Sequence, residues 1–161
     1  MNIHAPPHHS SQLNITDDVL TKNPTPFIMR YQDYIDAFNH NADQDAKAQF
    51  FTEDTTLEAP YLPTGILHGR TAIMAMFAAA HAKVKEELRP RLVVQQGDDV
   101  IMAEVDACFV ANEDTHESGF YDFKKGEAVS FRFFGVYELR DDRIAKMRLS
   151  YWPSPSMIEA F

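Results

Sequence analysis

Two acidic side chains alternate with apolar ones in the segment 100–111, and they are the first candidates for proton transfer in this sequence. Glu104 and Asp106 share one face of an extended chain, because successive side chains of a strand point to opposite faces. Two carboxylates that are held close together and shielded from water do not both ionise easily, so one of them could act as a general acid or base. The same alternation is typical of a half-buried strand whose acids face solvent. The sequence alone leaves both interpretations open.

Two histidines are further candidates for carrying a proton, because the pKa of histidine lies close to neutral pH. His68 stands in a stretch rich in Pro and Gly, where an exposed loop histidine is the ordinary interpretation and contact with a substrate is the alternative. His81 stands on the apolar face of a helical pattern, where a hydrogen-bonded core histidine is the ordinary interpretation and a cavity-facing one the alternative. The N-terminal histidines have no acids nearby, and we expect neither a metal site nor a cofactor.

Hydrophobic spacing predicts helices first and strands afterwards. Helical spacing runs from Pro26 to Phe38, over 45–51 and from Arg70 to Leu88. A β-prone run at 55–57 and an irregular loop at 61–69 separate the second and third helices. Strand-like segments then follow at 91–96, 100–111, 128–139 and 143–152. Helices followed by an antiparallel meander indicate the α+β class.

The first 25 residues differ from the rest of the chain in carrying prolines among polar residues with no hydrophobic period. We therefore expect a flexible N-terminal arm at 1–25. The chain has 161 residues, which suits one domain, and we expect that domain to span 26–161.

Composition narrows the partners that the protein could have. Hydrophobic residues make up 45% of the chain and aromatic residues 12%, which is enough for a packed core around a cavity. The net charge of −9 repels phosphate backbones and anionic lipids, so we expect neither nucleic acid nor membrane as a partner. The single cysteine, Cys108, excludes an internal disulfide, and a cytoplasmic protein is the simplest expectation.

Five short strings, taken in order, resemble a known superfamily. Resemblance to ketosteroid isomerases and SnoaL-like polyketide cyclases is carried by Tyr34-Ile-Asp-Ala-Phe-Asn, Phe50-Phe-Thr-Glu-Asp-Thr-Thr-Leu-Glu-Ala-Pro60 and Gly69-Arg-Thr-Ala-Ile73. Similarity to limonene-1,2-epoxide hydrolases is carried by Gly97-Asp-Asp-Val-Ile-Met-Ala-Glu-Val-Asp106 and Gly135-Val-Tyr-Glu-Leu-Arg-Asp-Asp-Arg-Ile144. The resemblance implies the nuclear transport factor 2-like (cystatin-like) fold. In that fold a cone-shaped, curved antiparallel sheet wraps around three N-terminal helices and leaves a deep cavity.

The resemblance also implies roles for single residues. It places Tyr34 where the isomerases keep a tyrosine that stabilises an oxyanion. It places Asp106 at one of the two carboxylates that flank the reacting water in the hydrolases. Ala59 and Gly135 stand where the isomerases have a base and a protonated acid, so this chain lacks both groups at those positions.

Two further acids bear on the implied cavity. Glu104 replaces the arginine that accompanies the hydrolase carboxylate, and Leu149 replaces the second carboxylate. Glu58 could supply the missing base from one residue before Ala59, although adjacent side chains of a strand point to opposite faces.

The walls of the implied cavity are aromatic and apolar, which favours a hydrophobic, cyclic ligand. An ordinary hydrophobic core is the alternative interpretation of the same residues. The side chains that we expect to contact a substrate are Tyr31, Phe38, Glu58, Phe77, His81, Phe131, Phe133, Tyr137 and Leu149.

The function expected from the sequence is a cofactor-independent acid–base enzyme of the isomerase, cyclase, dehydratase or hydratase type. In it Asp106 is the principal acid or base, Tyr34 the hydrogen-bond donor, Glu104 the group that tunes Asp106, and His68 or His81 a second proton carrier. The alternative is a non-catalytic module that binds a small ligand or forms oligomers. We also expect a homodimer, because acids that point inward would leave the apolar face of the segment 100–111 exposed.

Overall fold

The protein is described by a computed structural model at residues 26–40, 44–115 and 121–151, so the predicted arm at 1–25 lies outside the described residues. The chain forms α1 (Pro26–Asn39), α2 (Gln44–Ala48), β1 (Phe51–Glu58), β2 (Ile66–His68), α3 (Arg70–Lys83), β3 (Val84–Gln96), β4 (Val100–Ala111), β5 (Ala128–Arg140) and β6 (Arg143–Tyr151). This order confirms the predicted α+β class.

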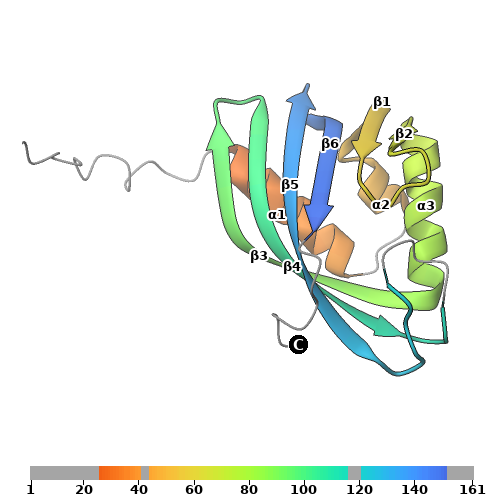
Figure 1. The fold of residues 1–161 in the computed structure, drawn as a ribbon. Coiled ribbons are helices and arrows are strands. Elements are labelled where there is room, and N and C mark those ends of the chain that lie inside the picture. The colour runs from red at the N-terminus through yellow and green to blue at the C-terminus, as the bar shows by residue number, and fades with distance from the viewer. Residues whose placement is uncertain (1–25, 41–43, 116–120, 152–161) are drawn as a thin grey trace, which may run out of the picture.

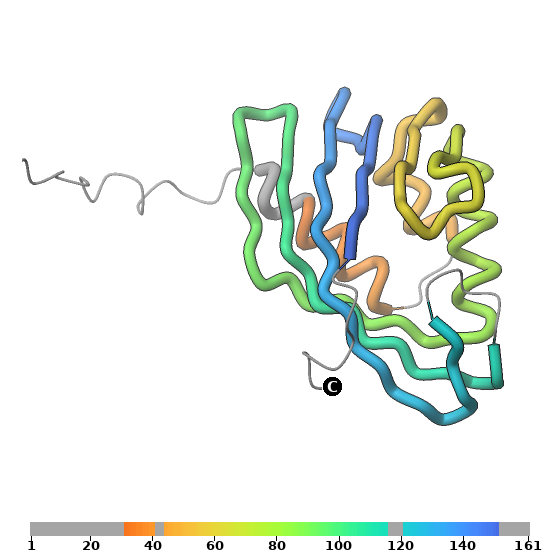
Figure 2. The backbone as a smooth tube through the Cα atoms, viewed as in Figure 1, coloured from red at the N-terminus to blue at the C-terminus, as the bar shows by residue number. Residues whose placement is uncertain are grey.

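A six-stranded sheet organises these elements in the order β2-β1-β6-β5-β4-β3. Strands β1 and β6 are parallel, and the other neighbours are antiparallel. The long strands β3, β4 and β5 curve past α1 toward the lower end of α3 (Figures 1 and 2). The sheet stays open, and the helices lie on its concave side, as the predicted cone requires.

The two faces of β4 have different surroundings. Ile101, Ala103 and Val105 are buried in the main hydrophobic core with residues of α1 and α3. Met102, on the opposite face, has 55% of its surface exposed. The odd-numbered residues of this strand therefore face the concave side, and the even-numbered ones face the convex outer side.

The boundary between α3 and β3 differs from the prediction. The helical pattern extended to Leu88, but α3 ends at Lys83 and β3 begins at Val84. Val84 and Leu88 are four residues apart, and that spacing fits one face of a helix and one face of a strand equally well. Pairing of β3 with β4 along nearly its whole length decides for the strand.

A β-bulge in β3 changes which residues face the core. Pro90 pairs with Val105 and Leu92 with Glu104, so Arg91 is an extra residue in the ladder. Leu88 packs on the main core before the bulge, and Val93, of the opposite parity, packs on it afterwards. The bulge thus keeps both halves of a long, bent strand in contact with the core.

Two short elements also differ from the prediction. The second helix ends at Ala48, and Phe51 opens β1 as a fully buried residue. The predicted loop at 61–69 contains β2, whose three residues lie between Gly65 and Gly69, both with positive φ. A strand of three residues between two turns gives no period that a sequence could reveal. Among the described residues, no helix is long and apolar enough to cross a membrane.

Candidate active site

An apolar pocket of about 100 Å³ lies between the concave face of the sheet and the helices. Helices α1 and α3 and strands β3 to β6 all contribute side chains to its wall. The polar side chains among the described lining residues are Tyr34, Tyr61, His81, Glu86 and Tyr137. An aromatic wall with a few convergent polar groups is the usual form of a small-molecule site.

Glu86 is the carboxylate of this pocket. It follows Val84 on the inner face of β3 and lies opposite Phe109 of β4. Its Oε2 is 2.9 Å from Nε2 of His81, and the side chains of Glu86 and His81 are only 15% and 10% exposed. A mostly buried carboxylate held by one hydrogen bond keeps its other oxygen, Oε1, for a ligand. This is the arrangement that a general base needs.

Lys47 lies behind the histidine. Its Nζ is 3.2 Å from Nδ1 of His81 and 4.6 Å from the centre of the Phe38 ring, and the residue is 1% exposed. An ammonium group has only donors, so Nδ1 of His81 must accept and Nε2 must carry the proton that is donated to Glu86. Burial lowers the pKa of Lys47, an effect that the charge of Glu86 opposes. Lys47, His81 and Glu86 thus form a chain of hydrogen bonds that ends in the pocket.

A cluster of phenols faces the same space. Burial is the largest cause that raises the pKa of Tyr34, Tyr61 and Tyr137, and the nearby charge of Glu86 raises each of them further. For Tyr137 the pKa reaches about 12. Tyr31 donates a hydrogen bond of 3.2 Å to the Tyr137 hydroxyl. These phenols stay protonated at neutral pH, so they can donate hydrogen bonds to a ligand.

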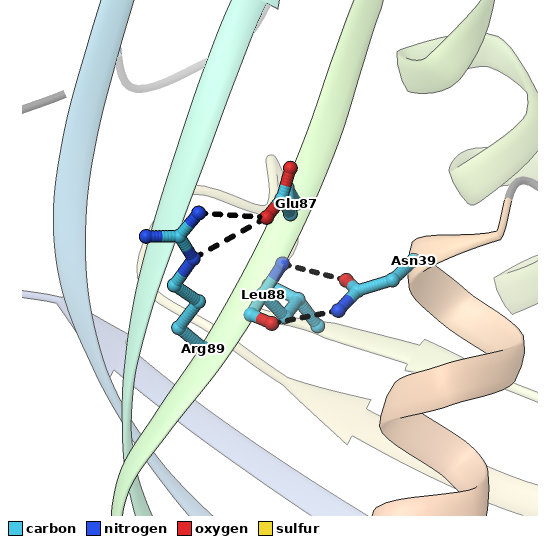
Figure 3. Close-up of polar contacts among 4 residues, drawn as sticks. All are labelled: Asn39, Glu87, Leu88 and Arg89. Carbon is cyan, nitrogen blue, oxygen red and sulfur yellow. Dashed lines mark hydrogen bonds and ion pairs between the residues drawn. The ribbon is translucent and has the colours of Figure 1, made fainter. Parts of the chain in front are cut away.

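Asn39, at the end of α1, fixes the part of β3 that carries Glu86. Its Nδ2 donates to the carbonyl of Leu88 at 2.8 Å, and the amide of Leu88 donates to its Oδ1 at 2.6 Å (Figure 3). β3 is the last strand of the sheet, and these two bonds occupy its free edge. Figure 3 also shows Glu87 and Arg89, which form an ion pair beside the clamp.

Comparison with protein families and solved structures now identifies the scaffold. The family model described as a SnoaL-like domain matches residues 31–147. The chain belongs to the SnoaL-like domain family. A search of curated proteins finds no match.

Solved structures similar to this SnoaL-like domain share its fold at low identity. A proposed polyketide cyclase from Xanthomonas campestris pv. campestris is 25% identical, with a TM-score of 0.66 over 78% of this chain and 90% of the other. An LEH-like epoxide hydrolase from M. tuberculosis is 16% identical, with a TM-score of 0.61 over 78% and 82%. A proposed isomerase from Bacillus subtilis is 18% identical, with a TM-score of 0.60 over 78% and 85%.

Most of the predicted wall residues lie around the pocket of this SnoaL-like domain. Those that line it are Phe38, Phe77, His81, Phe133, Tyr137 and Leu149, and the predicted donor Tyr34 lines it as well. Tyr31 lies next to them and lines a smaller adjoining cavity. Phe131 is instead buried in a second hydrophobic cluster with Phe109 and Phe123.

The interpretation that placed Glu104 and Asp106 in the cavity is wrong. Both acids are on the outer face of β4, and both pair with Arg132 of β5, while Arg91 of β3 lies 3.8 Å from Asp106. Arg132 donates from Nε to Asp106 Oδ1 at 2.7 Å and from a terminal nitrogen to Oδ2 at 3.1 Å, and it lies 3.1 Å from Glu104. Because an arginine stands between them, the two carboxylates form ion pairs and need not share a proton.

The two remaining acid–base candidates also lie away from the pocket of the SnoaL-like domain. Glu58 faces outward next to the buried Leu57 and pairs with Lys146 at 2.7 Å, as the period of a strand required. His68 is an exposed residue of the edge strand β2. No group of three or more His, Cys, Asp or Glu side chains in the described part of the chain is arranged to hold a metal ion.

The residues predicted from the sequence did not include Lys47, Tyr61 or Glu86. Glu86 shares its face of β3 with Val84 and Leu88, so a strand over 84–88 would have revealed it, but the helical interpretation of that segment did not. Tyr61 is in the segment 61–69, which was predicted only as an irregular loop. Lys47 gives no signal, because a buried lysine on a short helix looks like a solvated one in sequence.

Proposed function

We propose that this SnoaL-like domain is an enzyme that transfers protons on a small hydrophobic ketone, of the isomerase or cyclase type, with Glu86 as the base. The observation that carries the proposal is the Glu86–His81 hydrogen bond at the wall of an apolar pocket. The groups named for catalysis therefore change from Asp106 and Glu104 to Glu86 and His81, while Tyr34 keeps its proposed role as a donor.

The chemistry starts with Glu86. Its free carboxylate oxygen removes a proton from the carbon next to a ligand carbonyl, and the electron pair of that C–H bond moves to the carbonyl oxygen. The resulting enolate is stabilised by a phenol such as Tyr34, because a preorganised donor in a dry cavity acts strongly on developing charge. In a β,γ-unsaturated ketone the negative charge extends to the γ-carbon, so Glu86 can return the proton there while the carbon–carbon double bond moves next to the carbonyl. The net result is isomerisation, and it needs no oxidant or reductant.

A cyclase would use the same first step. The enolate carbon would attack a second carbonyl of the same ligand, a carbon–carbon bond would form, and the proton held by Glu86 would pass to the new alkoxide. The names of similar structures, which include a polyketide cyclase and an isomerase, support both outcomes. The pocket suits a hydrophobic ligand because its wall is mostly apolar.

The first test is exchange of α-hydrogens for deuterium in a panel of small cyclic ketones, followed by NMR. We expect the wild type to accelerate exchange and Glu86→Gln to lose about 100-fold or more of that rate, as a missing general base requires. Glu87→Gln is the matched control, because it removes the same charge from the next residue, which pairs with Arg89 outside the pocket. Equal exchange rates in wild type and Glu86→Gln would remove Glu86 from the mechanism.

A non-catalytic ligand-binding module is the second candidate. It is favoured by the absence of functional groups at Ala59, Gly135 and Leu149 and by the outward direction of Asp106. If this candidate is correct, the cyclic ketones of the panel bind to the protein, but their α-hydrogens exchange no faster than in solvent alone.

We further propose that the domain forms a homodimer through the outer face of the sheet. Leu92, Val94, Met102 and Phe134 are exposed there, around the ion pairs of Arg132. The patch contains charges of both signs, so a second copy could pair with it despite the net charge of the whole chain. Light scattering should give a dimer for wild type and for Thr71→Lys, a control on α3, and a monomer for Phe134→Lys. A wild-type monomer at micromolar concentration would contradict the dimer.

A further inference from the structure

Gly135 makes room for the ring of Tyr137. The two residues share the inner face of β5, and a Cβ atom at position 135 would lie 2.6 Å from Cε2 and 2.7 Å from the hydroxyl oxygen of Tyr137. Side-chain atoms do not approach a Cβ so closely. The φ of Gly135 is not in the left-handed region, so the glycine is required for space and not for backbone conformation. The Tyr137 phenol thus occupies the volume that any side chain at position 135 would fill.

The hydroxyl of Tyr137 has a defined direction. It accepts the hydrogen bond of Tyr31, whose ring meets the Tyr137 ring edge to face at 5.2 Å between centroids. A phenol that accepts one bond still has its own O–H to donate. Tyr137 is 5% exposed and lines the apolar pocket, so its O–H group can donate a hydrogen bond to a ligand there.

The other groups of the pocket restrict what could accept this bond. Glu86 carries a negative charge at the same wall, which disfavours an anionic ligand such as a carboxylate. The pocket is about 100 Å³, somewhat smaller than the roughly 150 Å³ cavity that holds one benzene ring. These limits allow no more than one ring in the pocket and favour a neutral acceptor oxygen over a carboxylate.

We infer that Tyr137 donates a hydrogen bond to the carbonyl oxygen of a neutral, one-ring ketone, and that Gly135 is required because it lets the phenol take this position. The inference rests on the proposed function in naming a ketone, but it concerns how the ligand is held and not whether it reacts. Tyr31 acts behind Tyr137 as a positioning residue.

The test is the carbonyl signal of bound acetophenone labelled with ¹³C at the carbonyl carbon. Donation of a hydrogen bond to a ketone moves this signal downfield, so acetophenone bound to the wild type should resonate downfield of acetophenone bound to Tyr137→Phe, which has no donor at this position. That shift should be absent in Tyr137→Phe, and affinity should fall about tenfold, which corresponds to about 1.4 kcal/mol. Tyr121→Phe is the matched control, because its hydroxyl bonds Glu127 away from the pocket.

Gly135→Ala gives an independent result, because the added methyl group must displace the Tyr137 ring and should abolish the shift while the phenol is still present. The inference is overturned if Tyr137→Phe keeps the wild-type shift and affinity, or if acetophenone does not bind the wild type at millimolar concentration. Glu86→Gln separates the two proposals, because it removes the proposed base and leaves the proposed hydrogen-bond donor, Tyr137, in place. A shifted carbonyl signal with no α-hydrogen exchange in any variant would leave this inference intact and refute the enzymatic function.

Discussion

Three side chains from three elements meet beside the pocket: His81 from α3 and Glu86 from β3 line its wall, and Lys47 from α2 lies behind His81. Each of them is mostly buried, and burial of charge is costly unless the charges are paired and hydrogen bonded. The chain of hydrogen bonds from Lys47 through His81 to Glu86 meets this requirement. It also assigns one tautomer to His81, which makes Lys47 a positioning residue for the proposed base.

Lys47→Met should therefore affect activity more than stability. Without a donor at Nδ1, His81 can turn its proton away from Glu86, and the exchange rate should fall at least about tenfold. The free energy of unfolding should fall by no more than about 1 kcal/mol, because a methionine avoids the desolvation of a buried ammonium group. α-Hydrogen exchange and urea unfolding measure the two effects, with Lys125→Met on the surface as the control. An unchanged exchange rate would show that Lys47 does not position His81.

Gly135→Ala should destabilise the fold as well as alter the site. A methyl group that overlaps the Tyr137 ring must push it aside, and overpacking of this kind costs about 1–3 kcal/mol. The substitution Gly135→Ala is made in the wild type and in a Tyr137→Ala background, and urea unfolding measures its cost in each. The difference between the two costs is the contribution of the overlap with the Tyr137 ring. The cost should largely vanish in the second background, and an equal cost in both would contradict the proposed overlap.

At the scale of the element, β4 shows what a sequence can and cannot predict. Its predicted bounds, 100–111, are those of the structure, because alternation of polar and apolar residues marks a strand clearly. Alternation also shows that Glu104 and Asp106 share a face, but it does not say which face is inside. Both acids point outward, where Arg132 of β5 lies opposite Asp106. This partner can be identified only once the register between β4 and β5 is known.

Strand β3 shows a different limit. The sequence around Glu86 fits a helix and a strand alike, and only pairing with β4 decides between them. The bulge at Arg91 then changes the parity of the strand, and the sequence offers no sign of it apart from Pro90. As a result, the sequence predicted the fold and seven of the fifteen described residues that line the pocket, but not the acid that we propose as the base.

The Asn39 clamp makes a prediction about this same strand. Asn39→Ala removes both hydrogen bonds to Leu88, and at about 1 kcal/mol for each bond the free energy of unfolding should fall by about 2 kcal/mol. The amide of Leu88 should also exchange with solvent faster. Gln49→Ala, which removes a hydrogen bond at an exposed site on the surface, should change stability by less than about 0.5 kcal/mol. Wild-type protection of the Leu88 amide in Asn39→Ala would argue against the clamp.

At the scale of the whole molecule, the buried phenols predict loss of stability in alkali. The pKa values of Tyr31, Tyr34, Tyr61 and Tyr137 are all raised above the ordinary value of 10. Above pH 10 the unfolded chain therefore releases protons that the folded chain retains, and stability falls as pH rises. The lowered pKa of Lys47 has the opposite effect at pH values just below 10.5. There the unfolded chain holds a proton on this lysine that the folded chain has lost, so stability rises with pH.

Urea unfolding at pH 8, 10 and 11 checks this expectation. The free energy of unfolding should fall between pH 10 and 11 by up to about 1.4 kcal/mol for each buried phenol. Phenolate absorbance should appear in step with unfolding. Reversible ionisation of all tyrosines near pH 10 in the folded protein would contradict the burial of these four groups.

The parallel pairing of β1 with β6 has a consequence for how the pocket comes to exist. Phe51, near the start of the described chain, pairs with Ile144, near its end. Contacts between residues so distant in sequence form late, because a long loop must close before they contribute any free energy. β6 also supplies Met147 and Leu149 to the wall of the pocket. During synthesis, the pocket therefore cannot close until the ribosome has released β6, so ligand binding can report on completed folding of the whole domain.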